Sequence, residues 1–284
     1  NDSLQAFGVD TSTFYAIIIQ DTYQFYWDTP LRQILTKLKS YQEKAHVDGF
    51  IIGVSGGVDS ALTSTLCALT GAKVILLNMP IRQTSAEYNR AQEHIQDLKS
   101  RFPNVQAFEI PLTEIFSSFE SVMPFEISSQ ALAMANSRSR LRMMTLYAVG
   151  QANRCLVAGT GNRVEDFGVG FFTKYGDGGV DVSPIADLTK TEVFQLAESL
   201  NVVNSILTAA PTDGLWEDGR SDEDQIGATY PELEWAMDYR GDSTELSVRE
   251  KEVLRIYQGF HSANKHKMEP IPVCLIPREL KNAE

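Results

Sequence analysis

The chain has 284 residues, of which 43% are hydrophobic, and a formal net charge of −12. It is long enough to bury a full core, it has no run of about 18 apolar residues that would predict a membrane span, and its acidic balance disfavours a dedicated nucleic-acid binder. Its three cysteines are far apart and form no CxxC pair: Cys67, Cys155 and Cys274. They predict unreactive thiols in a reducing compartment, so we expect a cytoplasmic protein.

The first predicted elements are helical. The apolar spacing over 14–44 predicts an N-terminal helical segment, and Pro30 fits the first turn of its second helix. Residues 1–30 contain no motif that we can place.

Four short apolar runs then alternate with helical patterns, and they are predicted as strands over 49–54, 74–79, 105–110 and 155–158. Two helices lie between them, one over 58–69 that ends at Gly71 and one that starts at the capping box of Thr84 and Glu87. This alternation predicts an α/β fold, with an open, mostly parallel sheet and helices on both faces. We expect one domain over 1–284.

A glycine-rich turn, Gly53–Ser60 with the sequence GVSGGVDS, follows the first predicted strand. The backbone N–H groups of such a turn, and the positive end of the next helix, bind anions. The turn lacks the lysine of the common phosphate loop and instead carries Asp59. A carboxylate beside a phosphate needs a divalent cation between them, so the turn predicts metal-bound pyrophosphate. The structural alternative is an ordinary turn with Asp59 near a helix N-terminus.

The second half begins with a predicted long helix, Ser128–Asn153. A second glycine-containing turn, Gly159–Asn162, follows the fourth strand. Ligands of open sheets bind beyond the carboxyl ends of the strands, so we expect both turns to face one crevice.

Two stretches, 165–184 and 210–224, have no clear periodicity and are predicted to be irregular. Capping boxes at Thr189 and Ser247 predict helices that run to about residues 200 and 263. The last of these helices begins a C-terminal helical segment with a tail, 247–284.

The residues SGGVDS resemble the pyrophosphate loop of the ATP-pyrophosphatase superfamily, whose sheet is Rossmann-like, of the adenine nucleotide α-hydrolase type. The Gly159–Asn162 turn, Glu165 and the run FTKYGDGG at 172–179 resemble NAD synthetases more specifically. Arg140–Met143 and His266–Lys267 match that family as well. The resemblance covers about residues 30–270. It implies the ammonia-dependent form, because 284 residues leave no room for the amidase domain of the glutamine-dependent form.

This resemblance implies a ligase that amidates deamido-NAD with ammonia in the last step of NAD biosynthesis. The nicotinate carboxylate would attack the α-phosphorus of ATP, and ammonia would then attack the NAD-adenylate, releasing NAD, AMP and pyrophosphate. Magnesium is the implied cofactor, and a homodimer is the implied assembly, with neither nucleic acid nor membrane as a partner.

The resemblance also implies the site residues. The magnesium ligands would be Asp59 and Glu165, and the catalytic residues Lys190 and Asp177. Asp177 is a candidate for handling the ammonium proton, because the nucleophile must be neutral ammonia. The implied ATP-binding residues are Gly53, Val54, Ser55, Gly56, Gly57, Val58, Asp59, Ser60, Thr160, Lys190 and Thr212. The implied deamido-NAD-binding residues are Arg140, Lys174, Asp181, His266 and Lys267.

Two alternatives stay open at the level of sequence. Another ligase of the superfamily, such as GMP synthetase or a tRNA-thiolating enzyme, would share the turn but would leave FTKYGDGG unexplained. A non-catalytic nucleotide-binding module would share the sheet, but it would not need two metal-binding carboxylates. The rings of Phe171, Phe172 and Tyr175 fit either ligand stacking or packing.

Overall fold

The computed structural model describes residues 29–211 and 221–281. A helix over 29–44 precedes the named elements. In chain order these are β1 (Gly49–Gly53), α2 (Val58–Leu69), β2 (Lys73–Asn78), α3 (Ser85–Arg101), β3 (Val105–Glu109), α4 (Thr113–Val122), α5 (Phe125–Ser128), α6 (Ala131–Ala152), β4 (Cys155–Val157), η2 (Arg163–Val169), α7 (Lys190–Ser199), α8 (Asn204–Leu207), α9 (Asp222–Ile226), α10 (Tyr230–Asp238), η3 (Ser243–Glu245), α11 (Val248–Met268) and α12 (Arg278–Lys281).

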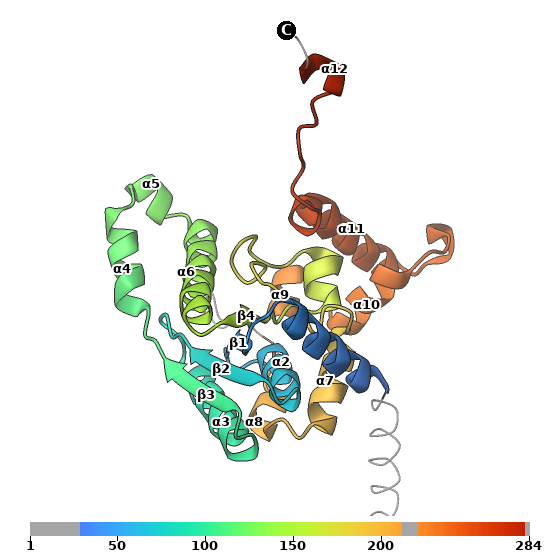
Figure 1. Cartoon of the computed structure of the whole chain (residues 1–284). Helices are drawn as coiled ribbons and strands as arrows, with labels where there is room; N and C mark the ends of the chain where they lie inside the picture. The colour runs from blue at the N-terminus through green and yellow to red at the C-terminus, as the bar shows by residue number, and fades with distance from the viewer. Residues whose placement is uncertain (1–28, 212–220, 282–284) are drawn as a thin grey trace, which may run out of the picture.

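The four strands form one sheet in the order β3-β2-β1-β4, and every neighbouring pair is parallel. Because the chain enters each strand from the same side, the carboxyl ends of β1, β2 and β4 lie along one edge (Figure 1). The predicted parallel α/β sheet is therefore confirmed, with each of the four strands placed to within one residue at either end.

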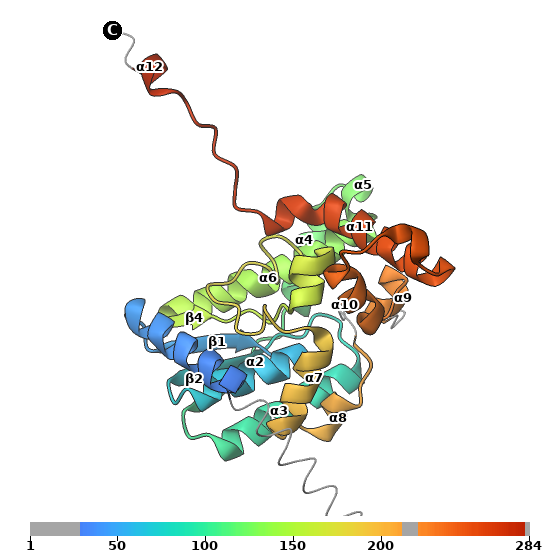
Figure 2. The same cartoon turned by 90° about the vertical axis from the view of Figure 1, so that its right-hand side faces the viewer.

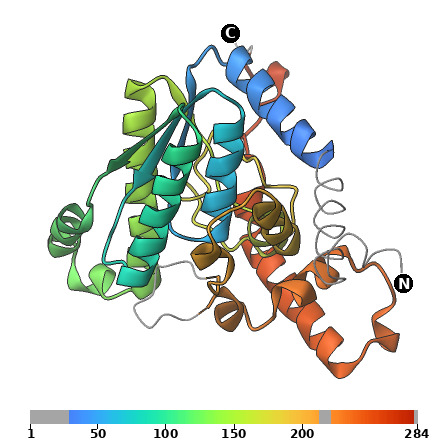
Figure 3. The ribbon, with the colours of Figure 1, turned by 90° about the horizontal axis from the view of Figure 1, so that it is seen from below.

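Side-chain alternation along β1 builds a core on both faces of the sheet. Phe50 and Ile52 pack with buried residues of α2, α3 and α7, whereas Ile51 packs with residues of α4 and α6. Figure 3 shows α2 and α3 on one side of the sheet and α6 on the other. The helices thus cover both faces, as the near-continuous apolar runs predicted.

A third apolar cluster lies outside the sheet and supports η2. Val164 and Val169 of η2 pack against Leu233 of α10 and Val253 of α11. This packing anchors the segment that carries Glu165 on two helices far along the chain.

The helix predicted over 128–153 is α6, which begins at Ala131, and a separate short helix, α5, ends at Ser128. Ser129 and Gln130 separate the two helices. The side chains of Ser128 and Ser129 offer the backbone local hydrogen bonds that compete with helix formation. The predicted position of the helix start was therefore wrong by three residues.

Other boundaries also differ from the sequence-based expectation. The segment predicted as irregular from 165 begins within η2, a π-helix capped by Asn162, and α9 begins at Asp222 inside the second irregular stretch. The last long helix continues to Met268, five residues beyond the expected end, because neither glycine nor proline occurs between residues 263 and 268 and its final turn carries basic residues that favour the helix dipole. The expected helix over 14–28 lies outside the described residues.

Beyond α11 the chain runs away from the body toward α12 (Figure 2). Ile271, Val273 and Leu275 of this tail are exposed. Within the described ranges, no helix is both long and apolar enough to cross a membrane.

Candidate active site

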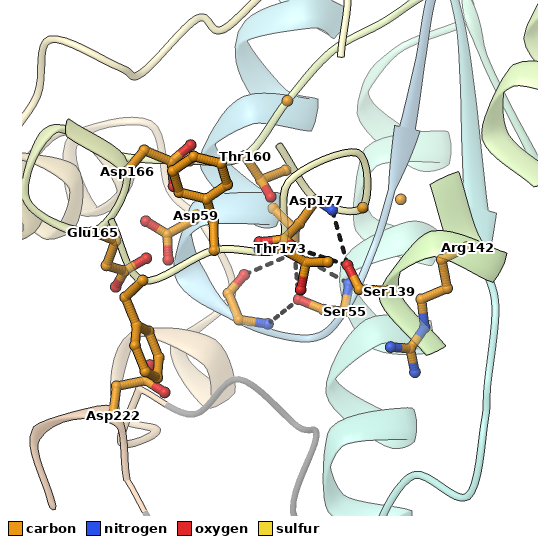
Figure 4. A pocket seen from close by; sticks show the side chains of 18 of the residues that line it. Ser55, Asp59, Ser139, Arg142, Thr160, Glu165, Asp166, Thr173, Asp177 and Asp222 are labelled. Carbon is orange, nitrogen blue, oxygen red and sulfur yellow. Dashed lines mark hydrogen bonds between the residues drawn. The ribbon is translucent and has the colours of Figure 1, made fainter. Parts of the chain in front are cut away.

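A cavity of about 700 Å³ opens at the carboxyl edge of the sheet, lined by both glycine-containing turns. The turn after β1 contributes Gly53–Ser60, and the turn after β4 contributes Gly159, Thr160 and Gly161. Figure 4 shows Ser55, Asp59 and Thr160 around this space. The prediction that the two turns face one crevice is confirmed.

The serine hydroxyl groups of the first turn make hydrogen bonds within the turn itself. Ser55 Oγ and Ser60 Oγ lie 3.1 Å apart, and the Gly57 N–H donates to Ser55 Oγ at 3.3 Å. Gly56 has φ +88°, and a Cβ there would lie 2.5 Å from the Glu87 carbonyl oxygen. Only glycine fits this position without strain, and its backbone stays accessible to an anion.

Lys190 joins the turn to η2. Its ammonium donates to Asp59 Oδ2 at 2.6 Å and to Glu165 Oε1 at 2.9 Å. The three charges come from α2, η2 and α7, and the Lys190 side chain is only 4% exposed. The ammonium therefore lies between two carboxylates and offsets the repulsion between them.

This arrangement shifts the pKa values of all three groups. Burial raises the pKa of Asp59, although Lys190 opposes that shift. Burial also acts to raise the pKa of Glu165, but Lys190 and the Tyr230 hydroxyl outweigh it and the pKa is lowered. For Lys190, the two carboxylates outweigh burial and raise the pKa. At neutral pH the lysine stays protonated and Glu165 stays ionised.

Two residues that support this cluster were not predicted from the sequence. The Asn162 side chain caps η2 by accepting from the Val164 and Glu165 N–H groups, and it donates to Asp59 Oδ1 at 3.0 Å. Tyr230 donates its hydroxyl hydrogen to Glu165. The lysine ammonium also lies 5.0 Å from the centre of the Tyr230 ring. Asn162 could have been noticed as a cap before Glu165; nothing near Tyr230 in the sequence marks it.

The opposite part of the cavity wall is basic. Lys174 donates to the His266 carbonyl at 2.7 Å, and Lys267 donates to the Phe172 carbonyl at 2.6 Å. Arg140 donates to the Lys174 carbonyl at 3.3 Å. The structure thus brings together four of the five predicted deamido-NAD-binding residues, and all four line the cavity.

The Lys267 ammonium is half-buried over the ring of Phe172, 4.9 Å from its centre. Burial lowers its pKa, while Asp177 and Asp166 act in the opposite direction. The Phe172 ring therefore contacts a lysine that lines the cavity. In the same way, the Lys174 ammonium lies 5.6 Å from the centre of the Tyr175 ring.

Asp177 lies at the floor of the cavity within the 172–179 run. Its Oδ1 accepts from Ser139 Oγ at 2.6 Å and from the Thr173 N–H at 3.0 Å, and its own N–H donates to Ser139. Figure 4 shows this link between Asp177 and Ser139 of α6. The carboxylate thus ties the run to α6 while it faces the cavity.

Two predicted residues are not placed with the others. The Asp181 carboxylate accepts from Tyr147 and from the Val157 N–H, 2.9 Å and 2.8 Å away, and it is not among the cavity-lining residues. Its role in binding stays a prediction. Thr212 lies outside the described residues.

Arg142 of α6 also lines the cavity, although Arg140 was the arginine of this helix predicted to bind deamido-NAD. Its Nε donates to the Met79 carbonyl at 3.2 Å, and burial lowers its pKa to about 10. Arg140 is exposed, whereas Arg142 is half-buried.

The profile of the NAD synthase family matches residues 31–271. The chain is 35% identical to an NH3-dependent NAD+ synthetase of Mesoplasma florum, covering 86% of this chain and 94% of the relative. It is 36% identical to one of Carboxydothermus hydrogenoformans, covering 87% and 98%. The chain belongs to the NAD synthase family.

Solved structures agree with this membership. The structure of an NMN synthetase from Francisella tularensis aligns with a TM-score of 0.75 at 30% identity, covering 89% of this chain and 98% of that one. An NH3-dependent NAD synthetase from Campylobacter jejuni aligns with a TM-score of 0.65 at 24% identity, covering 86% and 99%. The second of these supports the fold alone. The resemblance to NAD synthetases and the Rossmann-like fold class are therefore confirmed, and the expected ligase chemistry is that of the family.

Proposed function

We propose that this NAD synthase family member is an ammonia-dependent NAD synthetase, which amidates deamido-NAD at the expense of ATP and releases AMP and pyrophosphate. One observation carries the proposal: a single cavity has a glycine turn with a buried cation–carboxylate cluster on one wall and several basic side chains on the other. A reaction between ATP and an anionic dinucleotide needs both walls.

The first wall suits the triphosphate of ATP. The Gly53–Ser60 turn offers N–H groups and two hydroxyls to the leaving pyrophosphate, and Lys190 supplies a cation to phosphate oxygens. Asp59 and Glu165 would hold magnesium, which when bound neutralises charge on the phosphates. Their buried carboxylate oxygens already share one cation, which supports this fit. Among the described residues no three potential ligand side chains cluster, so nucleotide oxygens would complete the coordination.

The second wall suits deamido-NAD. Lys174, Lys267 and Arg140 present cationic groups whose hydrogen-bond acceptors are neutral carbonyls, so each is available to a phosphate or carboxylate. Asp177, on the floor between the walls, would accept a proton as ammonia attacks the activated carboxyl group. We also propose Asp181 and Thr212 as binding residues, as the family resemblance implies.

The test is an assay with ATP, magnesium, deamido-NAD and ammonium. We expect NAD, AMP and pyrophosphate in equal amounts, with glutamine replacing ammonium poorly. Formation of ADP, or ATP consumption without NAD, would refute the proposal. Efficient use of glutamine would refute the proposed nitrogen source.

The likeness to an NMN synthetase favours a second candidate, in which the substrate is nicotinic acid mononucleotide and the product is NMN. The same nicotinate carboxyl group would be activated, but the substrate would lack its AMP half. Competition between equal concentrations of the two substrates separates the candidates. We expect deamido-NAD to be favoured, and a preference for the mononucleotide would replace the first proposal with the second.

We further propose a homodimer. Val122, Phe125 and Leu132 of α4, α5 and α6 are 74%, 80% and 65% exposed, which is unusual for large apolar side chains on neighbouring helices. A second copy would cover them. Light scattering should give twice the chain mass, and Phe125→Asp should shift the mass toward that of a single chain.

We also propose a cytoplasmic location, which the three free thiols of the chain support. The match of one family profile over 31–271 supports the proposal that the chain acts as one domain.

A further inference from the structure

Tyr230 begins α10 and is only 5% exposed. Its hydroxyl donates to Glu165 Oε1 and lies 3.2 Å from Asp222 Oδ2. Figure 4 shows Glu165 and Asp222 on the same side of the cavity as Asp59. A buried tyrosine hydroxyl therefore lies between two carboxylates that come from η2 and α9.

The Tyr230 hydroxyl and the Lys190 ammonium both donate to one atom, Oε1 of Glu165. Two donors on one oxygen restrict the rotation of the carboxylate, and its other oxygen, Oε2, accepts from neither of them.

The backbone around Tyr230 is fixed as well. Its N–H donates to Glu223 Oε1 at 2.7 Å, and a capping box of Thr229 and Glu232 begins the helix. The ring packs in the third apolar cluster with Val164 of η2. Tyr230 is thus rigid relative to the segment that carries Glu165, which a residue that orients another side chain has to be.

We infer that Tyr230 is a positioning residue for the magnesium–ATP site, and that it holds the Glu165 carboxylate in place when Lys190 turns from the carboxylates to the phosphates. The inference rests on the proposed function. The Lys190 ammonium has three N–H donors, two of which bond to Asp59 and Glu165, so a bound phosphate would share its single charge with Glu165. The tyrosine hydroxyl has no such competing task, so it keeps Glu165 directed at the cation.

The test compares Tyr230→Phe with Tyr257→Phe. Phenylalanine keeps the ring beneath Lys190 and removes only the hydroxyl. Tyr257 packs in the same apolar cluster, but the hydroxyl that bonds to Glu165 is that of Tyr230, so the Tyr257 variant is a matched control. Binding of Mn²⁺ is measured by electron paramagnetic resonance, with an ATP analogue whose α–β bridge is a methylene group, so that no reaction occurs.

We expect Tyr230→Phe to weaken Mn²⁺ binding about 10-fold, as is usual when a partner of a metal ligand is removed. The Mg²⁺ concentration for half-maximal pyrophosphate release should rise by the same factor, and excess Mg²⁺ should restore the rate. Tyr257→Phe should leave both values unchanged. Unchanged Mn²⁺ binding in Tyr230→Phe, or a rate that excess Mg²⁺ does not restore, would overturn the inference.

A double-mutant cycle with Glu165→Gln gives a second measurement. If the hydroxyl acts through Glu165, Tyr230→Phe adds little to the loss of Mn²⁺ affinity in the Glu165→Gln background. Fully additive losses would overturn the inference. Failure of the proposed function would give a different result, because a protein that forms no NAD can still bind Mn²⁺ with the analogue. The Mn²⁺ affinities of Tyr230→Phe and of the double mutant would then still test the inference.

Discussion

The two walls of the cavity treat charge in opposite ways. On the phosphate wall, Lys190 is buried, the Asp59 and Glu165 side chains are 17% and 15% exposed, and the ammonium pairs with both carboxylates. On the basic wall, Lys174 and Lys267 donate to main-chain carbonyls and make none of the ion pairs found among the described residues. The first wall contains a counter-ion of its own without substrate, whereas the cations of the second wall are available to an anion. Removing the cation of the first wall should therefore affect folding together with activity, and substitutions on the second wall should affect binding alone.

The largest effect is expected for Lys190→Met. It leaves two buried carboxylates without their cation, which should lower the free energy of unfolding by about 3–5 kcal/mol. Activity should fall by about 100-fold or more, since a phosphate-binding cation is lost. Urea unfolding and pyrophosphate release measure the two losses.

The stability loss in Lys190→Met should depend on pH with a defined sign. Without the lysine, both carboxylates have raised pKa values in the folded state, so their destabilising effect is present at neutral pH and disappears as they become protonated on acidification. The difference from the parent protein should therefore shrink toward pH 4. A difference that is constant with pH would show that the carboxylates are not its cause.

Asp59→Asn should separate activity from stability on the same wall. Burial raises the pKa of Asp59, so its ionised form costs folding free energy that a neutral amide does not. We expect stability to stay within about 1 kcal/mol of the parent, while activity falls at least about 100-fold because a magnesium ligand is lost. Full activity in this variant would contradict the assignment of Asp59 as a metal ligand.

Asp177→Asn tests the floor between the walls. The amide oxygen can still accept from Ser139 and Thr173, so the fold of the run should persist. Amide formation should fall about 100-fold, as for a lost general base, with a much smaller fall in adenylation. Quenched-flow separation of the two steps measures this, and an equal loss in both would argue against proton transfer by Asp177.

Lys267→Met should give the smallest effect. Loss of one charged contact to the dinucleotide should raise the KM for deamido-NAD by about 10-fold, with the KM for ATP and the thermal midpoint little changed. Lys265→Met is the matched control, because Lys265 lies on the same helix in an exposed pair with Glu269, 3.4 Å away. An equal rise in the KM for deamido-NAD in both variants would contradict the distinction between the two walls.

Most of the sheet and most of the cavity residues could be predicted from the sequence, because strand alternation, glycine turns and capping boxes are local signals. The role of Tyr230 could not be predicted from the sequence. Its partner Glu165 is 65 residues away, and their contact depends on the packing of α10 against η2. The sequence also favoured Arg140 over Arg142. Both arginines line the cavity, and only the surrounding structure shows that the second of them does so.

The Lys190 ammonium between Asp59 and Glu165 has a practical consequence. Proteins that use a metal ion to neutralise buried ligands lose their fold when a chelator removes it. Here the counter-ion is covalently part of the chain, so dialysis against EDTA should abolish catalysis and leave the circular dichroism spectrum and melting curve unchanged. Magnesium would then act as a switch for turnover alone, and the enzyme could be stored metal-free and reactivated by adding the ion.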